Sequence, residues 1–244
     1  RLNTCPLGAA ALAGSSHPLE REVSATLLGF DSPVSNTYDA VASADWQTDL
    51  AHVSQSSALT LSRFVCDLLG WAAQHHFLVP DGLVQGSSIM PQKRNPVALE
   101  HARTHFSRAL GAAQSVVYAQ HNIPFGDLND FGPDIQGSLR NLFLQLSGGV
   151  ELLTASLEGG RFDEAALAEL AAESDTTATE LADVLTRELG VAFQQSHHLA
   201  AELAHYQQRH ERPLQTATPA DLTAVGGPEV SAAVLHDALS PKAF

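Results

Sequence analysis

Three long segments of the chain repeat apolar residues at spacings of three and four, the pattern of a helix with one buried face. They cover residues 45–77, 96–121 and 135–157. The second is rich in alanine, which allows close helix packing. Because short connections favour antiparallel neighbours, the pattern predicts a bundle of three long helices.

The rest of the chain predicts shorter helices. No segment shows the alternation and turn signals that are typical of a strand. Shorter helices are expected at residues 18–29, 163–172, 176–190, 196–209 with Ser196 as the cap, from Thr218 or Asp221 onward, and 228–239. We therefore predict an all-α fold. Residues 1–159 form a central domain, the long antiparallel helical bundle, and residues 160–244 form a small helical C-terminal domain.

The most informative irregular segment is residues 86–96, Gly-Ser-Ser-Ile-Met-Pro-Gln-Lys-Arg-Asn-Pro. Glycine and serine favour a loop. Asn95 followed by Pro96 is the pattern of a helix cap and first helical residue. Free backbone N–H groups at a helix start favour an anion. Residues 30–38 and 122–133 also read as loops.

Charge narrows the range of partners. Lys and Arg number 13 against 27 Asp and Glu, which gives a formal net charge of -14. A nucleic-acid partner is disfavoured, because phosphate binding needs a basic face. An anionic substrate would need a local positive site, and Lys93 and Arg94 beside a helix start provide one.

Composition also bears on location. The two cysteines, Cys5 and Cys66, do not suggest a disulfide framework and fit a reducing compartment. No stretch of about 18 uncharged apolar residues predicts a membrane span. The first residues lack the pattern of a signal peptide. We expect a cytoplasmic protein with no membrane partner.

The residue types in the loop at 86–96 suggest carbon-acid chemistry. The chain has no Gly-x-Ser-x-Gly elbow, no phosphate loop of the Gly-Lys-Ser/Thr type and no dinucleotide fingerprint. A serine can still act as a base if dipoles and cations stabilise its alkoxide. Deprotonation next to a carboxylate creates an enediolate-like anion, which Lys93, Asn95 and loop N–H groups could stabilise. On the loop pattern alone, Ser87 is more simply interpreted as a turn residue than as a catalytic one.

The loop at 86–96 resembles the signature of the fumarase/aspartase superfamily, and its Pro-Gln-Lys form resembles the argininosuccinate lyase branch. The likeness extends over nearly the whole chain. It includes residues 1–14, residues 39–41 with Asp45, residues 177–192 and Asp237-Ala238-Leu239-Ser240-Pro241 near the end. A match of eleven residues in one loop is a specific signal.

The resemblance implies a lyase that removes an amine from the carbon next to a carboxylate and releases fumarate. By position, Ser87 would be the base, Lys93 and Asn95 would stabilise the aci-carboxylate intermediate, and Glu100 would orient a catalytic histidine. Ser88, Met90, Gln92 and Phe125 would contact the substrate. In the family that histidine precedes the equivalent of Arg1, and three subunits of a homotetramer share each site. The chain alone would then be inactive. No cofactor and no metal are expected, and the partners are a small dicarboxylate substrate and other copies of the chain.

Two departures leave the substrate open. Argininosuccinate lyases carry a Tyr, a Gln and a Lys in the region equivalent to 124–134; here Phe125 stands for the Tyr, and the Gln and Lys are not evident. Ala44 replaces a common Arg. A site without these hydrogen-bonding residues discriminates less well in favour of argininosuccinate. Another N-substituted aspartate, or an amino- or nitrosuccinate, is an alternative substrate, and C–O elimination is disfavoured by Gln92.

Other readings of the chain stay open. A non-catalytic assembly protein of the same fold is the main alternative to an enzyme. Arg94 reads as a solvated charge, and Glu100 can simply complement the helix dipole. His101 and His105 have metal-ligand spacing but no third ligand, so a histidine pair without metal is favoured. The acidic loop with Asp127, Asn129, Asp130 and Asp134 lacks the calcium-loop pattern.

Overall fold

The computed structural model describes residues 2–129 and 132–241, with the side chains of 133 and 134 excepted. The described residues are mostly α-helical, which confirms the predicted all-α class. The chain divides into two compact units, residues 1–161 and 162–244.

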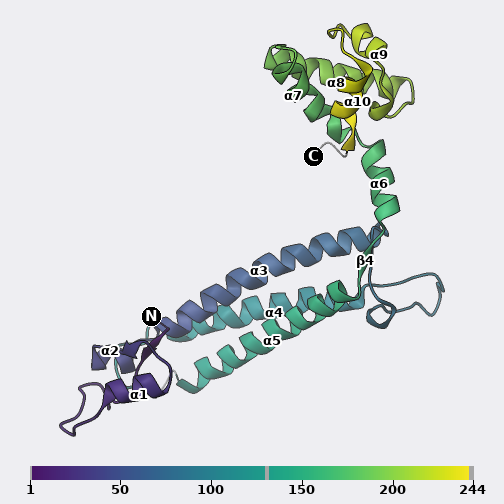
Figure 1. The fold of residues 1–244 in the computed structure, drawn as a ribbon. Helices are drawn as coiled ribbons and strands as arrows, with labels where there is room; N and C mark the ends of the chain where they lie inside the picture. The colour runs from purple at the N-terminus through teal and green to yellow at the C-terminus, as the bar shows by residue number, and fades with distance from the viewer. Residues whose placement is uncertain (1, 130–131, 242–244) are drawn as a thin grey trace. The chain divides into compact units, whose positions relative to one another are not determined.

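The first unit is built on three long helices that lie side by side with alternating direction (Figure 1). They are α3 (Asp45–Ala73), α4 (Val97–Gln120) and α5 (Gly132–Glu158). This confirms the three predicted helices. The first ends four residues before the predicted Phe77, because the chain turns at His75, which has a φ of 62°.

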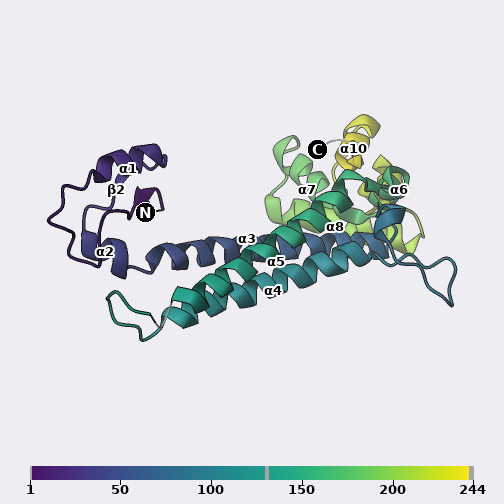
Figure 2. The same cartoon turned by 90° about the horizontal axis from the view of Figure 1, so that it is seen from below.

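Helix α4 packs against both neighbours, and its buried side chains are the centre of the core (Figure 2). Small residues at Ala102, Ala109 and Ala113 let the helices approach, and the buried Phe106 fills the largest space. The small side chains allow close approach of the helices, and the single large ring of Phe106 fills the space between them.

Gly149 of α5 faces the ring of Phe106 and leaves no room for a side chain. A Cβ built on Gly149 would lie 2.6 Å from Phe106 Cε1, whereas one on Gly137 of the same helix would meet nothing within 4 Å. Gly149→Ala is therefore expected to destabilise the unit by about 1–3 kcal/mol. Gly137→Ala, the matched control, should stabilise the helix by up to about 1 kcal/mol. Urea midpoints followed by circular dichroism measure both; equal shifts in the same direction would contradict the packing.

The N-terminal part of the first unit departs from the sequence-based prediction. Two strands of two residues each, β1 (Thr4–Cys5) and β2 (Ser32–Pro33), pair in parallel. Thr4 lies opposite Ser32, and Cys5 lies opposite Pro33. The expectation of no strands is wrong here, because two residues are too few to show alternation. Helix α1 (Arg21–Leu27) lies within the predicted segment 18–29.

A short helix, α2 (Thr37–Ala42), begins inside the predicted loop 30–38. The side chain of Asn36 caps it by accepting the backbone N–H groups of Tyr38 at 3.0 Å and Asp39 at 3.5 Å. An Asn side chain in this position satisfies N–H groups that have no partner in the helix. The helix was missed because six residues carry too little periodicity.

Between α3 and α4 the chain forms β3 (Phe77–Leu78) and the 3-10 turn η1 (Asp81–Leu83). Strand β3 pairs with β4 (Arg161–Phe162), the strand on which the first unit ends. Gly160 lets the end of α5 approach β3, since a Cβ there would lie 2.4 Å from the Phe77 ring. Gly159-Gly160 thus acts as a point of close packing.

The second unit is a small helical fold with its own core. Its elements are α6 (Glu164–Glu173), η2 (Asp175–Thr177), α7 (Ala178–Arg187), α8 (Phe193–Arg209), η3 (Leu214–Thr216), α9 (Pro219–Ala224) and α10 (Ala232–Leu239). Leucines from α7 to α10 form the buried cluster: Leu181, Leu185, Leu199, Leu203, Leu214, Leu222, Leu235 and Leu239. The predicted cap Ser196 is a correction: α8 starts at Phe193, and Ser196 is buried inside it, where its Oγ accepts the Thr186 hydroxyl at 2.9 Å.

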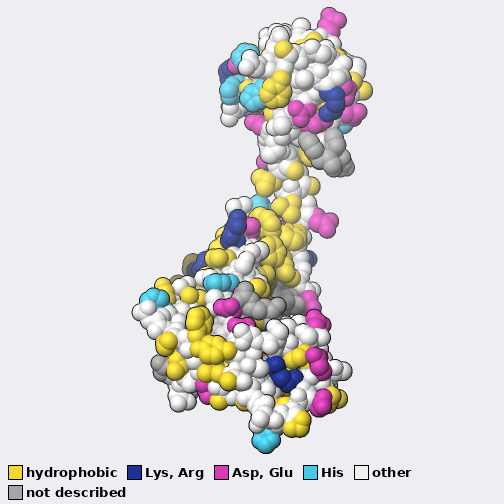
Figure 3. Space-filling model, turned by 90° about the vertical axis from the view of Figure 1, so that its left-hand side faces the viewer, with side chains coloured by type: hydrophobic (Ala, Val, Ile, Leu, Met, Phe, Trp, Pro, Cys, Tyr) yellow, Lys and Arg dark blue, Asp and Glu magenta, His cyan; other side chains and the backbone are white. Residues whose placement is uncertain are grey.

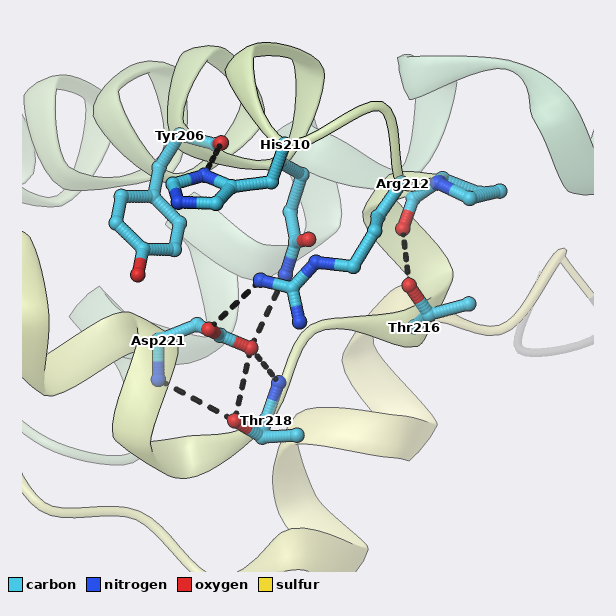
Figure 4. Close-up of polar contacts among 8 residues, drawn as sticks. Tyr206, His210, Arg212, Thr216, Thr218 and Asp221 are labelled. Atoms are coloured by element: carbon cyan, nitrogen blue, oxygen red, sulfur yellow. Dashed lines mark hydrogen bonds and ion pairs between the residues drawn. The ribbon is translucent and has the colours of Figure 1, made fainter.

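A polar network in the second unit joins the end of α8 to the start of α9 (Figure 4). Asp221 accepts the Thr218 backbone N–H at 2.8 Å, the Arg212 guanidinium at 2.9 Å and the Gln207 amide at 3.2 Å. Thr218 and Asp221 cap each other's backbone N–H groups in a capping box. Partial burial tends to raise the pKa of Asp221, but Thr218 and Arg212 outweigh it and lower that pKa to about 2.

Large apolar side chains remain exposed on the first unit. Figure 3 views the end that carries α1 and α2, where apolar side chains are visible on the surface. Exposed side chains also follow the bundle: Val53, Leu59, Phe64 and Trp71 on α3, and Phe143, Leu144, Val150 and Leu157 on α5. No helix in the described part of the chain is both long enough and apolar enough to cross a membrane.

Candidate functional site

The signature loop, residues 86–94, leaves and rejoins the fold at one narrow neck. Gln85 and Asn95 exchange backbone hydrogen bonds of 2.9 and 3.0 Å across this neck. The Asn95 side chain donates a third bond, from Nδ2 to the Gln85 carbonyl at 3.1 Å. This corrects the prediction that Asn95 caps the next helix: α4 starts at Val97 after Pro96, with no side-chain cap. The Asn95 amide is instead used to close the loop.

Ser87 lies at the start of the loop and is half-buried. Its Oγ accepts the backbone N–H groups of Ile89 at 3.2 Å and Met90 at 3.1 Å. Two amide donors aimed at one oxygen favour negative charge on that oxygen. The geometry therefore stabilises the alkoxide that a serine base requires, and the same bonds form the local turn that holds Ser87 in place.

The other loop residues with expected roles face solvent. Ser88, Met90, Gln92 and Lys93 are exposed, and the loop turns back where the Lys93 backbone N–H bonds to the Met90 carbonyl at 3.0 Å. Glu100 is exposed in the first turn of α4, three residues after the helix starts. One chain thus presents an open loop that carries a hydroxyl, an ammonium and amides.

Arg94 holds the base of the loop to the connector after β3. Its Nη2 donates to the Val79 carbonyl at 3.0 Å and forms an ion pair of 2.5 Å with Asp81. The Asp81 carboxylate is largely exposed, so the pair alone adds at most about 1 kcal/mol. The sequence predicted a solvated charge at Arg94 and gave no indication of an ion pair with Asp81. No spacing rule links two loop residues thirteen positions apart.

The loop that follows α4, which carries Phe125, and the signature loop that precedes α4 lie at opposite ends of this helix (Figures 1 and 2). Phe125 is 78% exposed, and its carbonyl accepts the Tyr38 hydroxyl at 3.0 Å. The 24 residues of α4 separate the two loops, a length of roughly 36 Å. The predicted site residues therefore form two groups in one chain. Asp130 and Phe131, part of the predicted substrate stretch, lie outside the described residues.

One histidine of the pair on α4, His105, contacts a side chain of α5. His105 Nδ1 lies 2.9 Å from Gln145 Oε1 of α5. Among residues 2–129 and 132–241, no cluster of three or more His, Cys, Asp or Glu is arranged to hold a metal ion. The calcium-loop alternative depends partly on Asp130 and the Asp134 side chain, which lie outside this description.

Two protein-family models match the chain. Residues 1–111 match a lyase family, and residues 175–244 match the argininosuccinate lyase C-terminal family. The first match includes the signature loop and the start of α4, and the second includes most of the second unit.

Solved structures of lyases share the fold. An EDDS lyase variant with bound fumarate has a TM-score of 0.84 and 27% identity, over 98% of this chain and 49% of that one. A class II fumarase from Schistosoma mansoni has a TM-score of 0.74 and 19% identity, over 98% and 52%. A fumarate lyase:delta crystallin from Brucella melitensis, bound to cobalt, has a TM-score of 0.75 and 22% identity, over 99% and 52%. The last two show likeness of fold alone.

The two family models and the EDDS lyase likeness support a lyase of the fumarase/aspartase superfamily. Within that superfamily, the C-terminal model suggests the argininosuccinate lyase branch. The chain spans about half the length of the solved structures it matches.

Proposed function

We propose that the chain is part of a carbon–nitrogen lyase of the argininosuccinate lyase type. The enzyme eliminates an amine from an N-substituted aspartate and releases fumarate. The observation that carries the proposal is Ser87, whose Oγ accepts two loop amides inside the signature loop. This arrangement favours a serine alkoxide at the position where the family's signature requires a base.

In this mechanism the Ser87 alkoxide takes a proton from the carbon next to the substrate carboxylate. The electron pair moves into that carboxylate, and the resulting aci-carboxylate is stabilised by the Lys93 ammonium and by amide donors that include Asn95. The pair then returns to form the C–C double bond as the C–N bond breaks. The amine leaves with the bonding electrons and takes one proton from a general acid, which we assign to a histidine oriented by Glu100.

The amine half of the substrate is the open part of the proposal. The EDDS lyase variant is described with bound fumarate, which favours the same dicarboxylate product here. Phe125 offers an exposed apolar ring and no hydroxyl, so the region does not favour a strongly hydrogen-bonded amine. We therefore include other N-substituted aspartates and amino- or nitrosuccinates beside argininosuccinate.

We further propose that the working enzyme is a homotetramer with shared sites. Ser87 and Phe125 lie at opposite ends of α4, so one ligand reaches both groups only if they come from different copies. Exposed apolar side chains such as Val53, Leu59 and Leu144 give α3 and α5 faces that further copies could cover. By this reasoning a single copy of the chain does not bring the two groups together on one ligand.

The test is fumarate release by the complete gene product, followed by ultraviolet absorbance against a panel of N-substituted aspartates. We expect turnover of at least one member, a tetramer by light scattering, and no turnover by residues 1–244 alone. Malate added to the panel distinguishes C–O elimination. A tetramer that binds but turns over none of the panel would favour the alternative, a non-catalytic assembly protein of the same fold.

A further inference from the structure

A hollow of about 260 Å³ lies beside the neck of the signature loop. Its walls are the turn at residues 78–81, the end of α5 at Gly159 and the side chains of Arg94 and Arg161. It belongs entirely to the first unit. It is separate from the open face of the loop that carries Ser87.

The charges in this hollow are not balanced. Arg94 and Arg161 contribute two positive charges, and Asp81 contributes one negative charge. The ion pair with Asp81 uses only Nη2 of Arg94, as does the bond to the Val79 carbonyl. Within the described residues, the guanidinium of Arg161 makes no hydrogen bond or ion pair, and only the backbone of this residue takes part in the β3–β4 pairing. In a chain with 13 basic and 27 acidic residues, two guanidinium groups in one hollow leave an uncompensated positive site.

Gly159, the residue after α5, and Pro80 pack closely at one side of the hollow. A Cβ on Gly159 would lie 2.7 Å from Pro80 Cγ, so α5 and the turn at Pro80 are in close contact with no side chain between them. Gly159 therefore contributes only backbone to this wall. The remaining space is large enough for a small carboxylate or phosphate, and it is lined by donors from both arginines.

We propose that this hollow binds a small anion through carboxylate or phosphoryl oxygens, held between Arg161 and the free edge of Arg94. A guanidinium presents a planar fork of donors that matches both kinds of oxygen. Arg94 keeps its bonds to Asp81 and Val79, because these use a different nitrogen from the edge left for the ligand. Arg94 directly precedes Asn95 in the neck, so the bound anion restrains the base of the signature loop. The proposal does not depend on the lyase assignment.

The experiment is a titration of the whole protein followed by the side-chain Nε–H resonances of its arginines. The probes are fumarate and inorganic phosphate, with chloride at matched ionic strength as the reference. We expect saturable shifts of the Arg161 and Arg94 resonances. Arg161→Gln should weaken the affinity read at Arg94 about tenfold or more. Arg63→Gln, at an exposed arginine on α3, should leave it unchanged.

The outcomes separate the sources of the anion. Saturation by fumarate alone supports a carboxylate ligand, and saturation by phosphate alone supports a phosphoryl ligand. Equal shifts with chloride, or unchanged affinity in Arg161→Gln, overturn the proposal. Because the Arg161 resonance is read directly, fumarate bound near Ser87 does not imitate the result. If Arg161→Gln changes the melting temperature, Arg161→Lys, which keeps the charge and loses the fork, should still weaken binding.

Discussion

Ser87→Ala is expected to lower the rate of fumarate release by about a thousandfold. Loss of a general base typically costs between about 10² and 10⁴ in rate. Alanine removes both the oxygen that takes the proton and the acceptor of the Ile89 and Met90 amides. The measurement is kcat with the best substrate of the panel, using the complete protein.

Two controls distinguish the loss of a general base from a change in the conformation of the signature loop. Ser57→Ala, at an exposed serine on α3 that bonds only to the Val53 carbonyl, should retain full activity. Calorimetric titration of Ser87→Ala with fumarate should show affinity within a few-fold of the native protein, since product binding needs no base. If Ser87→Ala kept kcat within tenfold of the native value, another residue would have to be the base.

Asp221→Asn is expected to destabilise the second unit by about 1–3 kcal/mol at neutral pH. Asparagine retains one acceptor oxygen but loses the charge that Arg212 pairs with at 2.9 Å. Arg212 would then keep a positive charge beside a neutral amide, with its Nε already buried and without a partner. Amide hydrogen exchange across α8 and α9 in the whole chain measures the change.

The effect of this substitution should depend on pH in a defined direction. The pKa of Asp221 lies at about 2 in the folded unit against an ordinary value of 3.8, so its stabilisation is present above pH 3.8 and is lost as pH falls through about 2. A shift of this size corresponds to about 2 kcal/mol. The difference between native protein and Asp221→Asn should therefore shrink between pH 4 and pH 2. Asp237→Asn, at a largely exposed carboxylate near His236, should destabilise the unit far less at neutral pH.

The long helices of the fold could be predicted because their pattern extends over many turns. Asp45, Leu68 and Phe106 lie in helices predicted from spacing alone. Strands β1 and β2 could not be predicted, because each has two residues and their pairing joins positions 28 apart. Ser196 is a third case. Serine is a preferred capping residue, but Ser196 lies inside α8, where its hydroxyl accepts a hydrogen bond from Thr186. Tertiary contacts overrode the local preference.

For the candidate site, the sequence supplied the residue types and the loop, but not the three-dimensional grouping. Ser87 was singled out by its motif, whereas its two amide bonds depend on the turn that the loop adopts. Asn95 was expected at a helix cap and instead closes the neck. The role of Asp81 depends on the connector meeting Arg94, a contact that no local pattern encodes.

The length of α4 has a consequence for how such a protein can change over generations. If the loops at Ser87 and Phe125 work together across copies, their spacing is set by one helix of 24 residues. Each inserted or deleted residue would move one loop by about 1.5 Å and rotate it by about 100°. Insertions and deletions within α4 should therefore be selected against more strongly than substitutions at its exposed positions other than Glu100.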